Sequence, residues 1–190
     1  METIAKPWVS VAEYLEQEHR SELRHEYLDG QIRTMGYASE AHELIVANLV
    51  RLLGNCFLDT DARVYASNRL LHVPATNGFY YADALVVFGK PEFLQYKQKM
   101  QATLNPGVIV EVHSDSTMEY DQREKWASYQ QITSLRQYVM VWQDRQRVET
   151  YRRTTDSDEW IYTSINEPER PVRIGECTVS LTDIYAKVEL

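Results

Sequence analysis

The segment Val108–His113 constrains the fold more strongly than any other part of the sequence. An apolar run that is rich in β-branched residues predicts a buried strand. Glu111 lies inside this run, although an ionised carboxylate is costly to bury without a partner. We therefore expect Glu111 to lie at a strand end, to pair with a positive group, or to hold a metal ion.

A second acid interrupts another apolar run. Asp83 lies within Tyr80–Phe88, which we expect to form one buried strand. If the two strands are paired, the carboxylates of Asp83 and Glu111 could reach the same ion. Oxygen ligands of this kind suit Mg²⁺ or Mn²⁺, which commonly take one or two carboxylates from a protein and keep several waters. Two strand-end acids in structural ion pairs are the alternative.

Lys125 follows this strand on a predicted helix. The helix is expected to run from about Met118 to Gln131, with Ser116 or Thr117 as its N-cap. From there Lys125 could orient a nucleophile or hold a phosphate. It also stands four residues after Asp121, where an exposed pair would contribute only about 0.3–0.5 kcal/mol. The residues alone favour this second explanation.

The remaining pattern predicts a mixed α/β fold. A capping box at Ser10 begins a helix that runs toward His19, and Asp29-Gly30 marks a β-hairpin. Apolar residues at three- and four-residue spacings predict a long helix over Ser39–Leu58. Its expected buried stripe comprises Ala41, Ile45, Leu49, Leu52 and Cys56. Further strands are expected at 63–65, 70–73, 137–142, 147–152 and 160–162.

These elements are expected to form one domain over residues 1–190, in which a central mixed sheet is flanked by the Ser39–Leu58 and Met118–Gln131 helices. The polar segment Gly89–Pro106 is expected to be a loop or a short helix that lies over a site.

Charge and composition narrow the function. A net charge of −8 argues against broad electrostatic binding to nucleic acid, although a local basic groove stays compatible with it. No apolar segment approaches the ~20 residues of a membrane span, and the first residues lack a secretion signal. Cys56 and Cys177 have no partner spacing, so we expect two free, buried thiols in a reducing cytoplasm.

Several motifs together give the chain a family resemblance. The most specific match is the run from Val110 to Thr117, followed by Tyr120-Asp121 and Glu124-Lys125. The other matching residues are Arg24 to Gly30, Ala41-His42, Asn48-Leu49 and Asp83. The chain resembles the Uma2 family of endonucleases, which is abundant in cyanobacteria. The resemblance extends over nearly the whole chain and implies the PD-(D/E)XK restriction-endonuclease-like fold.

The resemblance implies a metal-dependent nuclease that acts on DNA. Asp83 and Glu111 would match the two metal-binding acids, with Mg²⁺ or Mn²⁺ as the cofactor. Lys125 would match a lysine that is displaced from the strand into the following helix.

Two further residues match supporting positions of the family pattern. Glu26 resembles an additional acid of the first strand, and His42 resembles a histidine of the first core helix. From the residues alone, His42 is better explained as a helix-start histidine with a satisfied ring than as a catalytic group. The corresponding alternative for Glu26 is an exposed cross-strand partner of Arg33.

The sequence departs from the family pattern at two positions. Ala82 replaces a proline that commonly precedes the aspartate, which leaves the metal-binding side chain in place. His113 occupies the position at which the parent motif has its lysine. The positive group of the site is therefore either Lys125 or His113.

Two other classes of function are compatible with the sequence. One is a non-catalytic binding module with the same fold, which the acidic charge and His113 favour. The other is an interaction subunit that forms a homodimer through surfaces rich in Tyr and Trp. Four arginines of the C-terminal half could contact phosphate, but a solvated strand face explains them better: Arg145, Arg147, Arg152 and Arg153.

Overall fold

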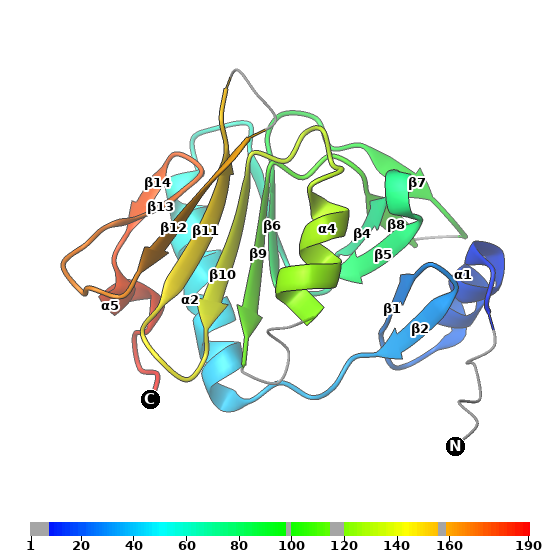
Figure 1. Cartoon of the computed structure of the whole chain (residues 1–190), viewed down its shortest axis with the longest axis horizontal. Coiled ribbons are helices and arrows are strands. Elements are labelled where there is room, and N and C mark those ends of the chain that lie inside the picture. The colour runs from blue at the N-terminus through cyan, green and yellow to red at the C-terminus, as the bar shows by residue number, and fades with distance from the viewer. Residues whose placement is uncertain (1–7, 98–99, 115–119, 156–158) are drawn as a thin grey trace.

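The computed structural model describes residues 8–97, 100–114, 120–155 and 159–190. Within these ranges the strands form two six-stranded sheets and one two-stranded sheet, and helices pack around them (Figure 1). This arrangement confirms the predicted mixed α/β class.

The first sheet contains the N-terminal hairpin. Its strands are β1 (His25–Leu28), β2 (Gln31–Thr34), β4 (Leu70–Val73), β5 (Gly78–Tyr81), β7 (Phe93–Gln95) and β8 (Gln101–Thr103), in the order β2-β1-β5-β4-β8-β7. The short 3₁₀ turn η1 (Pro74–Thr76) joins β4 to β5. Asp29 and Gly30 have φ angles of 43° and 81°, which suit the predicted tight turn between β1 and β2. Helix α1 (Val11–Arg20) begins with the predicted capping box at Ser10.

The second sheet is the central one. Its strands are β3 (Arg63–Ala66), β6 (Ala84–Val87), β9 (Val108–His113), β10 (Gln137–Trp142), β11 (Val148–Arg153) and β12 (Trp160–Ile165), in the order β12-β11-β10-β9-β6-β3. Strands β9 and β10 run parallel to each other, and all other neighbouring strands of this sheet run antiparallel. Because side chains alternate along a strand, Val110 and Val112 face one side of this sheet and Ile109 and Glu111 face the other.

Helix α2 (Glu40–Cys56) covers the side of the central sheet that carries Val110 and Val112, and it lies behind the sheet in Figure 1. Ser39 caps it, because its side chain accepts the N–H of His42. The buried residues of the helix are Ile45, Val46, Leu49 and Leu53. The buried face is thus rotated from the predicted stripe: Ala41 and Leu52 are half-buried, and Cys56 is exposed. No helix in the described ranges combines the length and the apolar character needed to cross a membrane.

The opposite side of the central sheet is covered by the helical segment that carries Lys125, which lies in front of the sheet in Figure 1. It consists of a π-helical turn η2 (Asp121–Lys125) followed by α4 (Trp126–Tyr129). The predicted helix start at Met118, the N-caps Ser116 and Thr117, and the side chain of Asp121 lie outside the described residues. Lys125 is buried, with 6% of its surface exposed, so the prediction of an exposed lysine is wrong.

The run Tyr80–Phe88 forms two strands, and the prediction of a single strand is therefore wrong. Its first part is β5 of the first sheet, and its second part is β6 of the central sheet. Asp83 lies between them, where the chain crosses from one sheet to the other. The residues on both sides of the break are apolar and buried, so Asp83 itself is the sign of the change of sheet in the sequence.

The segment Gly89–Pro106, which was expected to be a loop or a short helix, contains two short strands in its described residues. It contributes β7 and β8, which pair antiparallel at the edge of the first sheet. Strands as short as these give little periodic signal. Arg69, which lies outside this segment, holds both strands. Its Nε donates to the hydroxyl of Thr103 at 2.9 Å, and its guanidinium carbon lies 4.3 Å from the ring centre of Phe93.

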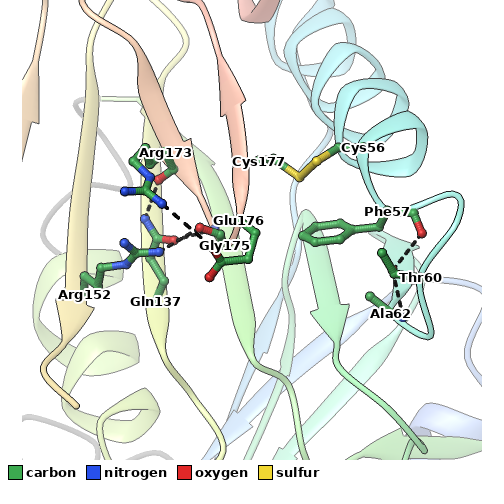
Figure 2. Close-up of a disulfide and its surroundings, with 10 residues drawn as sticks. All are labelled: Cys56, Phe57, Thr60, Ala62, Gln137, Arg152, Arg173, Gly175, Glu176 and Cys177. Atoms are coloured by element: carbon green, nitrogen blue, oxygen red, sulfur yellow. Dashed lines mark hydrogen bonds and ion pairs between the residues drawn. A yellow bond between two sulfur atoms is a disulfide. The ribbon is translucent and has the colours of Figure 1, made fainter. Parts of the chain in front are cut away.

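Cys56 and Cys177 form a disulfide, which corrects the expectation of free, buried thiols (Figure 2). Cys56 ends α2, and Cys177 begins β14 (Cys177–Val179), which pairs with β13 (Val172–Ile174). The two cysteines are 121 residues apart in the sequence, so no local spacing indicates the bond. The bonded cysteines give no support to a reducing compartment.

The C-terminal segment reaches Cys56 because it packs against α2. Asn48 of α2 donates from Nδ2 to the carbonyl oxygens of Ile184 and Ala186, at 3.0 and 2.9 Å. These carbonyls lie at the end of the short helix α5 (Leu181–Ile184). The contact places α5 and the β13–β14 hairpin beside the long helix.

Candidate active site

Three acids that the sequence singled out are buried in the structure. Glu26 on β1 is 4% exposed, Asp83 at the crossing is 7% exposed, and Glu111 on β9 is 3% exposed. A buried carboxylate needs a positive partner or hydrogen-bond donors. The contacts of these three groups define the candidate site.

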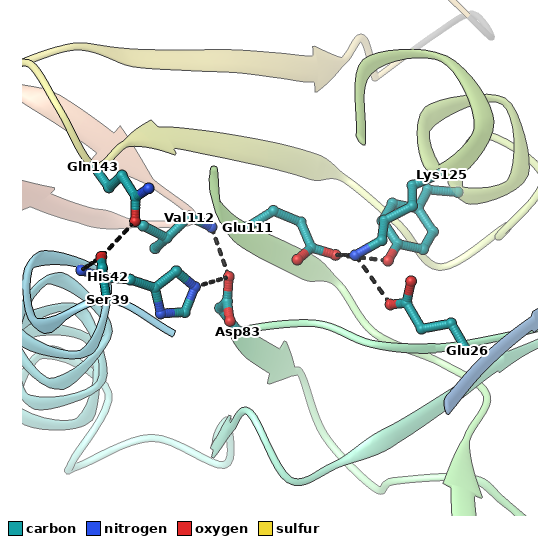
Figure 3. Close-up of polar contacts among 9 residues, drawn as sticks. Glu26, Ser39, His42, Asp83, Glu111, Val112, Lys125 and Gln143 are labelled. Atoms are coloured by element: carbon teal, nitrogen blue, oxygen red, sulfur yellow. Dashed lines mark hydrogen bonds and ion pairs between the residues drawn. The ribbon is translucent and has the colours of Figure 1, made fainter. Parts of the chain in front are cut away.

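Lys125 joins two of the carboxylates (Figure 3). Its Nζ lies 3.0 Å from Oε1 of Glu26 and 3.1 Å from Oε1 of Glu111. The three side chains come from the first sheet, the central sheet and the helical segment that follows β9. Glu26 also accepts the backbone N–H of Tyr81 at 3.2 Å, which holds its carboxylate against β5.

Glu111 has a further donor that the sequence reasoning missed. The hydroxyl of Tyr129 donates to Oε1 of Glu111 at 2.8 Å, and Tyr129 is fully buried. Burial, followed by the nearby charge of Glu111, raises the pKa of Tyr129 well above its ordinary value. The hydroxyl therefore keeps its proton and stays a donor. Tyr129 stands four residues after Lys125, so the helical spacing alone could have placed both on the Glu111 side.

Asp83 has a different set of partners. Its Oδ2 accepts the backbone N–H of Val112 at 2.7 Å, and Nε2 of His42 lies 3.2 Å from the same oxygen. His42 lies in the first turn of α2. That turn is held in place by Ser39, which donates to Oε1 of Gln143 at 2.8 Å.

The site therefore has two halves, which Figure 3 shows side by side. One half contains Asp83 and His42, and the other contains Glu111, Lys125 and Glu26. The halves meet on β9, because the residue that anchors Asp83 directly follows Glu111. In the ranges that the structure describes, no group of three or more His, Cys, Asp or Glu side chains is arranged to hold a metal ion.

His113 lies on the same side of β9 as Glu111 and is 1% exposed. Its ring contacts that of Trp142 edge to face, with 4.4 Å between the centroids. Of the two candidates for the positive group, it is Lys125 whose charged atom lies against the carboxylates.

Tyr120 and Arg33 are further neighbours of the site that the sequence reasoning did not assign to it. The guanidinium carbon of Arg33 lies 3.8 Å from the ring centre of Tyr120, and Nζ of Lys125 lies 5.6 Å from it. Burial, followed by the charge of Glu26, raises the pKa of Tyr120 above its ordinary value. Arg33 is also the residue of β2 that is paired with Glu26 of β1, so it adds a positive charge near that acid.

The sequence matches the family model described as "Uma2: Putative restriction endonuclease" over residues 11–183. The chain belongs to the Uma2 family. Two Synechocystis proteins are similar to it. One, named "Uncharacterized protein sll1609", is 30% identical over 83% of this chain and 87% of its own length. The other, "Uncharacterized protein slr1290", is 29% identical over 86% of this chain and 84% of its own length.

A solved structure shares the fold. The crystal structure of "a putative nuclease belonging to DUF820" from Anabaena variabilis matches with a TM-score of 0.73. The match covers 94% of this chain and 98% of the other, at 15% sequence identity. Together with the family match, this likeness confirms the predicted restriction-endonuclease-like fold.

Proposed function

We propose that this Uma2 protein is a Mg²⁺- or Mn²⁺-dependent endonuclease that hydrolyses phosphodiester bonds in DNA. The observation that carries the proposal is the position of three buried acids around β9: Glu26, Asp83 and Glu111. Family and fold indicate a nuclease of the restriction-endonuclease type. The metal, the substrate and the residue roles are the parts that we add.

The donor chemistry of the site fits a divalent cation. Three carboxylates lie among one ammonium group, Lys125, and one imidazole, His42. Even with both of these charged, these groups keep one net negative charge, and with a neutral imidazole they keep two. Asp83 and Glu111 would hold the ion, because Mg²⁺ is commonly bound by one or two carboxylates. When bound, such an ion lowers the pKa of a water and stabilises negative charge on a phosphate.

The protein groups supply position and charge. Nζ of Lys125 lies between two carboxylates and presents a compact positive charge to a phosphate oxygen. Tyr129 fixes the carboxylate of Glu111 through its hydroxyl. His42 and the N–H of Val112 fix the carboxylate of Asp83. His113 is given no role in this proposal, and its ring packs on Trp142.

Plasmid cleavage tests this proposal. We expect purified protein to nick or linearise plasmid DNA with Mg²⁺ or Mn²⁺ but not with EDTA. Asp83→Asn and Glu111→Gln keep the shape of each side chain and remove its charge, so both should abolish cleavage. Glu176→Gln is the matched control, because the Glu176 side chain is 78% exposed. If wild type cleaves no faster than the Asp83 and Glu111 variants, the nuclease proposal fails.

A non-catalytic binding module is the second candidate. It is favoured by the double contact of Lys125 with Glu26 and Glu111, since an ammonium group there neutralises two potential ligands. The absence of a three-ligand cluster among the described residues favours it as well. Calorimetric titration with Mn²⁺ separates the two candidates: heat of binding that depends on Asp83 supports the nuclease, and no such heat supports the module.

Three expectations about the molecule as a whole belong to the same proposal. They are a single domain over residues 1–190, a homodimer and a location in the cytoplasm. Light scattering measures the mass in solution and would contradict the homodimer if it gave the 22.2 kDa of one chain.

A further inference from the structure

A row of three tyrosines crosses the outer strands of the central sheet. Tyr138 on β10 is paired with Tyr151 on β11, and Tyr151 is paired with Tyr162 on β12. Directly paired residues of neighbouring strands point to the same face of a sheet. Tyr138 also contacts Tyr129 of α4, so the row lies on the side of the sheet that carries Glu111.

Tryptophans extend this row into a continuous aromatic surface. Trp126, which begins α4, stacks on Tyr151 with 4.4 Å between the centroids and 22° between the planes. It also stacks on Tyr138, and Trp160 meets it edge to face at 4.8 Å. The surface begins under the helix and continues to the last strand of the sheet.

The outer part of this surface is open to solvent. Tyr162 is 48% exposed, and Tyr151 and Trp160 are half-buried. Strand β12, which carries Tyr162 and Trp160, is the edge strand of its sheet. We call these three residues, Tyr151, Trp160 and Tyr162, the aromatic platform. An exposed group of large rings at a sheet edge is typical of a binding surface.

Arginines flank the platform at two ends. The guanidinium carbon of Arg153 lies 4.6 Å from the ring centre of Trp160. Toward the other end, Arg147 pairs with Glu149, and the same carboxylate accepts the hydroxyl of Tyr162 at 2.9 Å. Proteins that bind single-stranded nucleic acid combine aromatic rings, on which the bases stack, with positive groups such as guanidinium that contact the backbone.

The platform is continuous with the candidate active site. Glu111 on β9 is paired with Met140 on β10, and Met140 is paired with Glu149 on β11. Glu149 is in turn paired with Ser164 on β12. Neighbouring strands are about 4.8 Å apart, so β12 lies roughly 14 Å from β9. The platform therefore lies on the same face of the sheet as Glu111, two to three strands away from it.

We propose that the aromatic platform binds unpaired bases of single-stranded nucleic acid beside the site of cleavage. This inference rests on the proposed nuclease function, and it narrows the substrate to DNA with a single-stranded or unpaired segment. Stacking on the rings makes the affinity depend on the bases, so it should fall strongly when the bases are removed.

Fluorescence anisotropy tests the platform without any cleavage. The probes are a labelled 12-nucleotide DNA strand of mixed sequence and the same strand with abasic sites in its central half, both in EDTA. We expect wild type to bind the abasic strand at least about fivefold more weakly. Tyr162→Ala should bind the intact strand at least about fivefold more weakly, whereas Tyr162→Phe keeps the ring and should bind normally.

Ile161→Ala is the matched control, because Ile161 is 58% exposed on the same strand and points to the opposite face. Should Tyr162→Ala unfold, Tyr162→Leu keeps apolar bulk without a ring and takes its place. Equal binding of the intact and abasic strands, or unchanged binding by Tyr162→Ala, overturns the inference. The inference is also overturned if the wild-type protein is a dimer and the Tyr162→Ala variant is a monomer, because a second copy of the chain would then cover the platform.

The outcomes for the platform and for the nuclease are separable. Strand binding in EDTA by wild type and by Glu111→Gln, without cleavage under any condition, would keep the platform and reject the nuclease. Plasmid cleavage that depends on Glu111, with no base-dependent strand binding, would keep the nuclease and reject the platform.

Discussion

Lys125 and Glu111 form a buried ion pair in which Nζ and Oε1 are 3.1 Å apart, and their side chains are 7% and 4% exposed. The lysine comes from the π-helical turn and the glutamate from the middle of β9. The pair therefore fixes the helical segment against the strand. It also combines the two chemical groups on which the nuclease proposal depends.

Removing the lysine should strongly destabilise the protein. In Lys125→Met, Glu26 and Glu111 lose the ammonium group that they share, and we expect the free energy of unfolding to fall by about 3–5 kcal/mol. Urea denaturation measures this change. Lys97→Met is the control, because the Lys97 side chain is 53% exposed and its pair with Glu16 should contribute less than about 1 kcal/mol.

A second substitution separates charge from packing in this prediction. Adding Glu26→Gln to Lys125→Met removes one of the two carboxylate charges that lost the ammonium group. The double variant should therefore recover part of the lost free energy of unfolding. If Lys125→Met is as stable as wild type, the ion pair contributes nothing in solution.

The hydroxyl of Tyr129 should stabilise the same carboxylate. Tyr129→Phe removes the donor 2.8 Å from Glu111 and leaves the ring in place. We expect a loss of about 1.5–3 kcal/mol in the free energy of unfolding, because the bond is made to a charged acceptor. Tyr37→Phe, at a fully exposed tyrosine, should change nothing. An unchanged unfolding midpoint for Tyr129→Phe contradicts the contact.

The disulfide should contribute substantially to stability. Cys56→Ser opens a covalent loop that spans 121 residues, and we expect a loss of about 2–4 kcal/mol in the free energy of unfolding. Urea denaturation of wild type with and without a reducing agent should give the same difference. A reducing agent should leave the Cys56→Ser variant unaffected. Identical curves for oxidised and reduced wild type would show that the bond does not form.

His72 should make the stability depend on pH. Its ring stacks on Phe79 at 4.0 Å, and burial lowers its pKa below the ordinary 6.5, although a hydrogen bond with the carbonyl of Gly78 opposes this. Below about pH 6.5 the unfolded chain therefore binds more protons than the folded one, and stability falls as the pH falls. His72→Gln should lack this component. Urea denaturation at pH 7.5 and pH 5 should show a smaller loss for the variant than for wild type.

Local patterns predicted the parts of the fold that are long and periodic. The helix α2, the hairpin turn at Asp29-Gly30 and the strands β9 and β10 follow directly from spacing and turn chemistry. Glu111 was predicted to be a candidate site residue for a physical reason, because a carboxylate in an apolar strand needs a partner. The residues alone did not identify Lys125 as that partner, because they favoured an exposed pair of the lysine with Asp121.

The remaining features depend on contacts between distant residues. Asp83 lies where an apolar run changes sheets, but an isolated acid in such a run does not distinguish a break between strands from a buried, paired carboxylate. Cys56 and Cys177 meet only because the C-terminal segment packs on α2. Tyr129 was missed for a different reason: its spacing from Lys125 was visible, but a buried tyrosine is more commonly part of the core than a donor to a charged group.

Metal binding should be measurable as thermal stabilisation, independently of cleavage. If Asp83 and Glu111 hold Mn²⁺ in the folded state only, a concentration 100 times the dissociation constant stabilises the protein by about 2.7 kcal/mol. For a chain of this size that corresponds to a rise in Tm of roughly 5–10 °C. Asp83→Asn and Glu111→Gln should each remove most of this rise, and Glu176→Gln should keep it. Because Lys125 competes for the carboxylate of Glu111, Mn²⁺ should also bind more tightly to any folded Lys125→Met protein. An equal rise in Tm for wild type and the Asp83 variant would place the ion elsewhere.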